Sequence, residues 1–267
     1  MMSAFARAHQ VLGDPKYGEV AERAAQFILT KLYSENKKEL LRRYRDGEAR
    51  YEAHLEDYAF LTQGLIDLYE SSFNIRWLRT AMELTEQQNE LFYDKENGGF
   101  FDTSGKDKSI LIRTKESYDG AEPTGNSIGI LNLLRLSQMT DNQDWQKMAE
   151  KSLAYFGGHM LNMPQGLAQF LVALDFSLSK PKQIIIAGEA DNAHTQALLV
   201  EVHSRFIPHK IILLADGAEG QKILAAYVPF VDSLRMIDRK ATAYICENYA
   251  CQLPTSDPEV VARLLMN

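Results

Sequence analysis

The sequence has 267 residues, of which 45% are hydrophobic and 24% charged, as in an ordinary soluble globular protein. This length suits one large domain or two of moderate size. The net charge of -7 argues against sequence-independent nucleic-acid binding, which needs a basic face. No apolar run approaches the roughly 20 residues of a membrane span, and the start lacks the apolar core of a signal peptide. With only two cysteines, the composition predicts a cytoplasmic protein.

A helix–joint–helix pattern recurs three times along the first two thirds of the chain. Its aromatic anchors, about 60 to 70 residues apart, match one helical hairpin plus a return loop. Each anchor has an Asp or Asn three residues before it, which can cap the second helix. Each also has an alanine four residues after it, which allows close packing. The anchors are Tyr17, Trp77 and Trp145, and the capping residues are Asp14, Asn74 and Asn142. Core packing accounts for all these positions.

The periodicity predicts seven helices in this part. In an alternating barrel, the helices before each joint are inner and those after it are outer. Residues 40–47 and 94–102 read as short strand–turn segments between hairpins, the second with a strong turn signal at Asn97-Gly98-Gly99. The predicted helices span residues 2–12, 15–34, 53–71, 74–92, 123–139, 143–157 and 164–178.

The composition changes after residue 181. Apolar runs predict three strands, and the amphipathic stretch between the first two predicts a βαβ crossover with parallel strands. We therefore expect two domains, a helical one over 1–181 and a small α/β unit over 182–267. The first strand is not followed by a G-x-G-x-x-G motif and leads into an acidic loop, which argues against a dinucleotide cofactor. The strands are expected at 183–188, 209–216 and 241–246, and helices at 192–206 and 257–266.

The cysteines and histidines form no recognisable metal motif. Cys246 and Cys251 lack the C-x-x-C spacing, so we expect buried or incidental thiols. The six histidines are scattered without an H-E-x-x-H motif. His54 and Glu56, two residues apart on a helix, face different sides. We expect neither a metal nor a cofactor.

Two polar clusters begin predicted inner helices at the same end of the barrel. They hold the carboxylates Glu56, Asp57, Asp119 and Glu122. Two opposed carboxylates are the minimum for glycosidic acid–base chemistry. The structural alternative is that acidic residues in a first turn cap the helix and favour its dipole. Neighbouring side chains of the kind that recognise sugars or carboxylates are Tyr58, Tyr118, Arg113, Lys115 and Asn126.

Residues 55–61, 118–127 and 246–254 carry a family resemblance. They resemble the spermatogenesis-associated protein 20 / YyaL-type family, and the resemblance covers essentially the whole chain. Members typically have an N-terminal thioredoxin-like domain followed by an (α/α)6 toroid similar to N-acylglucosamine 2-epimerases and six-hairpin glycosidases. We therefore expect a mainly α fold, a partial (α/α)6 toroid of stacked helical hairpins with a small C-terminal α/β unit. Residues 2–7 match an inner helix, so we expect the thioredoxin-like domain to be missing from this chain.

The resemblance implies a carbohydrate-active fold. We predict a sugar epimerase/isomerase- or glycosidase-like enzyme in which Asp57 and Asp119 are the acid–base carboxylates. Glu56 and Glu122 would orient them. Substrate contacts would come from Tyr58, Tyr118 and Asn126, with Arg113 and His54 close by. His54 is the sole histidine of either cluster, although the epimerases of this fold use histidines for proton transfer.

The alternative is a non-catalytic scaffold or interaction module, a fragment of a larger thioredoxin-domain protein. Seven helices cannot close a twelve-helix ring, so an apolar flank must be covered, exposed or paired. That flank would dock the missing N-terminal portion or form a homodimer.

Overall fold

The computed structural model describes residues 1–34, 36–247 and 250–266. Asn248 and Tyr249 of the third family motif lie outside the described residues. Among the residues described, no helix is long and apolar enough to cross a membrane. The helical part consists of α1 (Met2–Leu12), α2 (Pro15–Lys31), α3 (Leu55–Ser72), α4 (Ile75–Phe92), α5 (Gly125–Thr140), α6 (Gln143–Asn162) and α7 (Ala168–Leu178).

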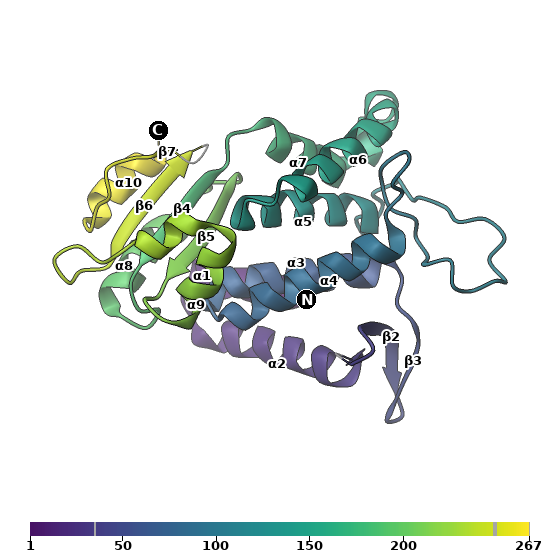
Figure 1. The fold of residues 1–267 in the computed structure, drawn as a ribbon, viewed down its shortest axis with the longest axis horizontal. Coiled ribbons are helices and arrows are strands. Elements are labelled where there is room, and N and C mark those ends of the chain that lie inside the picture. Colours follow the sequence, from purple (N-terminus) through teal and green to yellow (C-terminus); the bar gives the residue numbers. More distant parts are fainter. Residues whose placement is uncertain (35, 248–249, 267) are drawn as a thin grey trace.

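These helices form alternating inner and outer layers (Figure 1). The inner helices α1, α3, α5 and α7 pack against one another in succession. The outer helices α2, α4 and α6 each pack on the inner helix that precedes them. The prediction of a mainly α fold, a partial (α/α)6 toroid of stacked hairpins, is confirmed.

The joints between paired helices are capped as predicted. The Asp14 Oδ1 atom accepts from the Lys16 N–H at 3.0 Å, and Asn74 Oδ1 accepts from its own second helix at 3.1 Å. Asn142 Oδ1 accepts from two N–H groups, both at 3.1 Å. The alanines four residues after the anchors are fully buried, so the helices of each pair approach closely.

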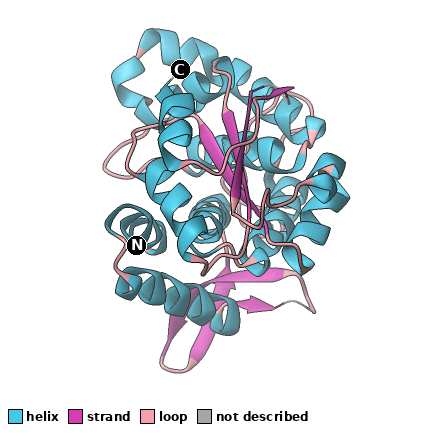
Figure 2. Cartoon of the chain, turned by 90° about the vertical axis from the view of Figure 1, so that its left-hand side faces the viewer, coloured by secondary structure: helices cyan, strands magenta, loops and turns pink. Residues whose placement is uncertain are grey.

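The second helix ends earlier than predicted. The sequence predicts helix to residue 34, but α2 ends at Lys31, and Tyr33–Ser34 forms β1. Strand β1 pairs with β2 (Glu39–Arg45), which forms a hairpin with β3 (Glu48–Glu52). Backbone pairing with β2 therefore overrides helix propensity here. This three-stranded sheet lies away from the larger sheet (Figure 2).

The last part of the chain is an α/β unit with strand order β5-β4-β6-β7. Strand β4 pairs in parallel with β5 and is connected to it by α8, which confirms the predicted crossover. Strand β6 joins antiparallel to β4, and the short β7 pairs with β6. The elements are β4 (Lys182–Ala187), α8 (Ala193–His203), β5 (Lys210–Ala215), α9 (Glu219–Tyr227), β6 (Thr242–Glu247), β7 (Ala250–Cys251) and α10 (Pro258–Met266).

A buried polar junction holds the α/β unit against the toroid. Strand β5 is at the edge of its sheet, and two of its outward N–H groups find acceptors on α3. The Ile212 N–H donates to Glu70 Oε1 at 3.2 Å, and the Leu214 N–H lies 3.5 Å from the Tyr69 hydroxyl oxygen. Arg135 of α5 lies 2.9 Å from Glu70 and 2.8 Å from Asp67.

Asp67 is the centre of this junction. Its carboxylate is 1% exposed and accepts from Arg135, Arg7 and Ser3. Burial alone would raise the pKa of Asp67, but the two guanidinium groups outweigh it and hold the pKa below its usual value. The ionised carboxylate therefore ties three inner helices together.

The cysteines differ from the expectation of free thiols. Cys246 and Cys251 form a disulfide. Their spacing along the chain concealed this, because β6 and β7 are antiparallel and place the two residues directly opposite each other.

Candidate functional site

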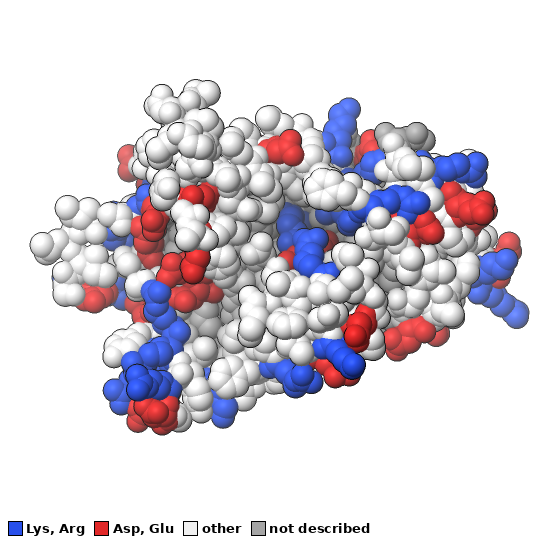
Figure 3. Space-filling view, turned by 180° about the vertical axis from the view of Figure 1, so that it is seen from behind, with Lys and Arg blue, Asp and Glu red and all other residues white. Residues whose placement is uncertain are grey.

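A cavity of about 320 Å³ lies between the starts of α3 and α5 and the long loop that connects α4 to α5. The two helix starts meet at Gly125. A Cβ atom there would lie 2.9 Å from the Glu56 backbone nitrogen, so this contact requires glycine. Figure 3 shows acidic side chains at the end of the molecule that carries the loop. The cavity is lined by His54, Leu55, Glu56, Asp102, Glu116, Tyr118, Glu122, Pro123, Thr124 and Gly125.

Arg42 of β2 orients the start of α3. Its guanidinium forms an ion pair with Glu56 and lies 2.5 Å from His54 Nδ1. A guanidinium can only donate, so Nδ1 accepts, and a neutral His54 carries its proton on Nε2. The Glu56 and Arg42 side chains are 48% and 38% exposed, so this charge pair remains accessible from solvent.

Asp57 caps α3. Its Oδ2 atom accepts from the His54 N–H at 2.9 Å and lies 3.9 Å from Arg42. Burial raises the pKa of Asp57, and the hydrogen bond and Arg42 offset that only in part. Asp57 lines a second, adjoining groove and is absent from the lining of the cavity itself.

Asp119 is buried, is absent from the cavity lining and organises two helix starts. Its Oδ1 atom accepts from the Thr124 N–H at 2.9 Å and the Ser127 hydroxyl at 2.7 Å. Its Oδ2 atom accepts from the Gln169 and Phe170 N–H groups at 2.8 and 3.1 Å. These four hydrogen bonds occupy both carboxylate oxygens, a geometry that favours a positioning role.

Glu122 and Tyr118 present accessible side chains to the cavity. Both are exposed, and among the described residues no hydrogen bond or ion pair engages the Glu122 carboxylate. The Tyr118 ring lies against Gly166, where a Cβ atom would be 2.9 Å from it. The cavity lining thus includes an aromatic ring and a carboxylate that is available to a ligand.

Three of the predicted substrate contacts lie outside the cavity lining and have structural partners. Tyr58 is buried, accepts from the Leu40 N–H at 3.3 Å, and has its pKa raised to about 12 by burial. Asn126 accepts from the Phe100 N–H at 2.7 Å and donates to two carbonyl oxygens. Arg113 donates to the Thr103 and Leu91 carbonyls. Tyr58 and Asn126 are buried, whereas Arg113 is half-buried and bonds to backbone carbonyls, so all three have structural roles here.

Lys115, the other cation of this loop, has a buried side chain that holds the loop in place. Its ammonium group lies 2.7 Å from Asp94 and 2.6 Å from the Gly98 carbonyl oxygen. It also lies over the Phe101 and Tyr155 rings, at 5.0 and 4.0 Å from their centroids. It therefore fixes the loop rather than lining the cavity.

The structure adds Arg42, Asp102 and Glu116, which the sequence analysis did not select. Asp102 accepts from the Glu116 N–H at 3.1 Å and the Thr114 hydroxyl at 2.8 Å, and its carbonyl accepts from the Leu55 N–H at 3.1 Å. It therefore closes the base of the loop against α3. The pairing of residues 102 and 114–116 across the loop left no periodic signal in the sequence.

The adjoining groove has a volume of about 640 Å³ and lies between α1, α2, β2 and α3. Its walls are largely apolar, with side chains such as Ile28, Leu41 and Phe60. Glu56 and Glu122 line both the groove and the cavity. Across the described ranges, no cluster of three or more His, Cys, Asp and Glu has a metal-binding arrangement.

The sequence is 36% identical over 274 residues to spermatogenesis-associated protein 20 of Homo sapiens, and 37% identical to that of Rattus norvegicus. Each alignment covers 99% of this chain and 35% of the relative, so the chain spans about a third of the length of these relatives. An uncharacterized protein of Caenorhabditis elegans is 25% identical over 95% of the chain. No protein-family model matches the sequence.

Two solved structures share part of the arrangement. Cellobiose 2-epimerase from Spirochaeta thermophila has 20% identity and a TM-score of 0.49, covering 60% of this chain and 41% of that one. The cellobiose 2-epimerase of Bacillus thermoamylovorans has 16% identity and a TM-score of 0.48, covering 58% and 42%. The sequence match to spermatogenesis-associated protein 20, which runs along almost all of this chain, confirms the resemblance that the three motifs indicate.

Proposed function

We propose that the cavity binds a sugar and supports acid–base chemistry of the sugar epimerase/isomerase or glycoside hydrolase type. The observation that carries this proposal is the pair of solvent-accessible carboxylates, Glu56 and Glu122, which approach one cavity from two different helix starts. Both reactions need two groups that give and accept protons on a small polyhydroxylated ligand. The Tyr118 ring provides an apolar surface for one face of a sugar ring.

Among the four predicted carboxylates, the geometry favours Glu56 and Glu122 over Asp57 and Asp119 as the acid–base pair. Glu122 is available to the ligand, and Glu56 is held in orientation by Arg42. Asp57 and Asp119 already accept hydrogen bonds that fix the helix starts, so we propose that they position the other two. His54 would donate to a ligand oxygen through Nε2.

The test is a panel of aldoses, N-acylated amino sugars and β-linked disaccharides followed by proton NMR. Epimerisation in D2O exchanges the proton next to the carbonyl for deuterium, and hydrolysis releases new reducing ends. We expect Glu122→Gln to lower turnover at least about 100-fold. Glu83→Gln, on an exposed position of α4, should have no effect. If no sugar binds and none turns over, the proposal fails.

A non-catalytic interaction module is the second candidate, and one observation favours it. An apolar groove of about 420 Å³ lies between α6 and α7, beside the exposed side chain of Leu161. Apolar grooves of this kind are typical of docking surfaces. We propose a second copy of the chain as the occupant in that case. Light scattering tests this, because a monomer at high concentration would contradict it and a dimer lost in Leu161→Asp would support it.

A further inference from the structure

The Cys246–Cys251 disulfide is asymmetric. Cys246 is fully buried in β6, whereas Cys251 on β7 is exposed to solvent. A thiol reagent in solution can therefore reach one side of the bond and not the other.

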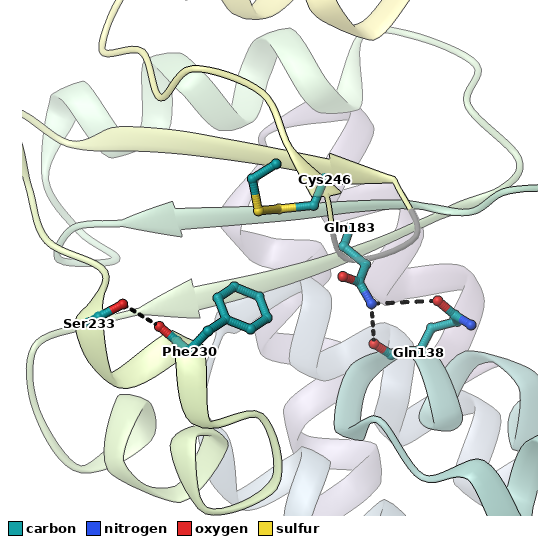
Figure 4. Close-up of a disulfide and its surroundings, with 6 residues drawn as sticks. Gln138, Gln183, Phe230, Ser233 and Cys246 are labelled. Carbon is teal, nitrogen blue, oxygen red and sulfur yellow. Dashed lines mark hydrogen bonds between the residues drawn. A yellow bond between two sulfur atoms is a disulfide. The ribbon is translucent and has the colours of Figure 1, made fainter.

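A buried glutamine lies beside the inner sulfur. Gln183 of β4 is the direct partner of Cys246 in the antiparallel register, so the two side chains share one face of the sheet. Directly opposed residues have Cβ atoms about 4.5–5.5 Å apart. Figure 4 shows the Gln183 side chain next to the disulfide and reaching toward α5.

The amide of Gln183 has one satisfied and one unsatisfied end. Its Nε2 donates to the Gln138 backbone carbonyl at 3.0 Å and to Gln138 Oε1 at 3.5 Å. Its Oε1 atom is buried and has no hydrogen-bond partner among the described residues. The carbonyl of Gln138 accepts only, so it fixes the orientation of the amide and keeps Oε1 on the other side.

The reduced cysteine pair can donate a hydrogen bond to the Gln183 Oε1 atom, whereas the oxidised pair cannot. A disulfide has no hydrogen to donate, whereas a Cys246 thiol is a donor placed on the same face as the unsatisfied Oε1. A buried acceptor without a donor costs free energy, and the thiol relieves that cost. We propose that Cys246 and Cys251 form a reversible redox couple that exchanges with a dithiol, and that Gln183 stabilises its reduced state.

The exchange is balanced with a dithiol as the reductant. A thiolate of the dithiol attacks the exposed Cys251 sulfur, and the Cys246–Cys251 bond breaks. Cys246 leaves as a thiolate and takes up a proton. The second thiol of the reductant then attacks the mixed disulfide and releases the Cys251 thiolate, which is protonated in turn. The protein gains two electrons and two protons, and the dithiol becomes a disulfide.

The first experiment locates the attacked sulfur in the full chain. Brief treatment with glutathione, acid quenching and alkylation of free thiols are followed by peptide mass spectrometry. We expect the glutathione adduct on Cys251 and the alkyl group on Cys246. An adduct mainly on Cys246, or a bond that resists reduction until the protein unfolds, would overturn the proposal.

The second experiment measures the redox equilibrium in mixtures of reduced and oxidised dithiothreitol. In Gln183→Leu the Cys246 thiol of the reduced state loses its acceptor, Gln183 Oε1. Half-reduction of the protein should then require a ratio of reduced to oxidised dithiothreitol about three- to tenfold higher than in wild type. Gln183→Leu also loses the hydrogen bond to the Gln138 carbonyl. Because the reduced and the oxidised protein both lose it, this loss does not change the midpoint. Gln138→Ala keeps that carbonyl, removes the 3.5 Å contact alone, and should leave the midpoint unchanged. Equal midpoints in wild type and Gln183→Leu would refute the role of Gln183.

An infrared measurement decides the matter if Gln183→Leu does not fold. Cys251→Ser leaves Cys246 as the single thiol of the protein. Its S–H stretching band should lie at the lower frequency of a hydrogen-bonded thiol. A band at the frequency of a free thiol would show that Gln183 does not accept from Cys246.

Discussion

The two ends of α3 use the same residue types in opposite ways. At its start, Arg42 pairs with Glu56, and both side chains are more than a third exposed. At its other end, Arg135 pairs with Asp67 and Glu70, and all three are at most 6% exposed. Charges that keep contact with water can be rearranged by a ligand at little cost, whereas buried charges depend on one another. The helix therefore joins an adaptable site to a fixed junction.

Removing the buried cation should have the largest effect. Arg135→Met leaves Glu70 without its ion-pair partner, while Asp67 keeps the ion pair with Arg7 and the hydrogen bond from Ser3. We expect a loss of about 3–5 kcal/mol in the free energy of unfolding, because an uncompensated buried charge remains. Urea denaturation followed by circular dichroism measures this. A loss below about 1 kcal/mol would show that the junction is less fixed than its contacts indicate.

A second substitution compares two carboxylates three residues apart. In Asp119→Asn an amide NH2 group, itself a donor, faces backbone N–H or hydroxyl donors. We therefore expect the free energy of unfolding to fall by about 2–4 kcal/mol. Glu122→Gln should change stability by less than about 0.5 kcal/mol while removing sugar turnover. An Asp119→Asn protein that is as stable as wild type yet inactive would instead restore the sequence-based prediction that Asp119 is an acid–base carboxylate.

The pH dependence of stability should differ in sign between the two ends. The pKa of Asp67 is lowered in the folded state, so its contribution is complete above about pH 5 and is lost as pH falls through the folded pKa. The pKa of Asp57 is raised, so its contribution is greatest at low pH and declines as pH rises through the folded pKa.

Melting temperatures between about pH 3 and pH 7 test this prediction. Asp67→Asn should flatten the acid limb of the stability curve. Asp57→Asn should remove the decline between low and neutral pH. Parallel curves for the two variants would contradict the opposite signs.

Breaking the ion pair at the site end should affect stability much less than breaking the buried one. Arg42→Met breaks a partly exposed pair and should cost at most about 1 kcal/mol. It should nevertheless weaken sugar binding, since Glu56 and His54 lose the group that orients them. Calorimetric titration of the Arg42→Met and Arg135→Met proteins with the sugar, side by side, compares the two ends directly. A stability loss as large as that of Arg135→Met would remove the distinction between the two ends.

Much of the scaffold could be predicted because it depends on local rules. Capping by Asp14, Asn74 and Asn142, the inner–outer alternation and the parallel β4–β5 pair all follow from periodicity and helix-end chemistry. The division at residue 181 stays a prediction, and the hydrophobic core is continuous across it. The cytoplasmic location also stays a prediction.

The candidate site was only partly predictable. Sequence places Glu56, Tyr118 and Glu122 at helix starts, and these line the cavity. It could not show that Asp119 turns inward, because the donors from Gln169 and Phe170 lie 50 and 51 residues farther along the chain. The disulfide was missed for a related reason, since strand pairing and not spacing brings its sulfurs together.

The edge of β5 has a consequence for association between molecules. A free sheet edge offers N–H and C=O groups to any other strand, which promotes aggregation. Here Glu70 and Tyr69 already accept from Ile212 and Leu214, so an incoming strand would have to displace buried side chains. The sheet is therefore closed to growth on this side, and the opposite edge ends in a strand of only two residues, Ala250–Cys251.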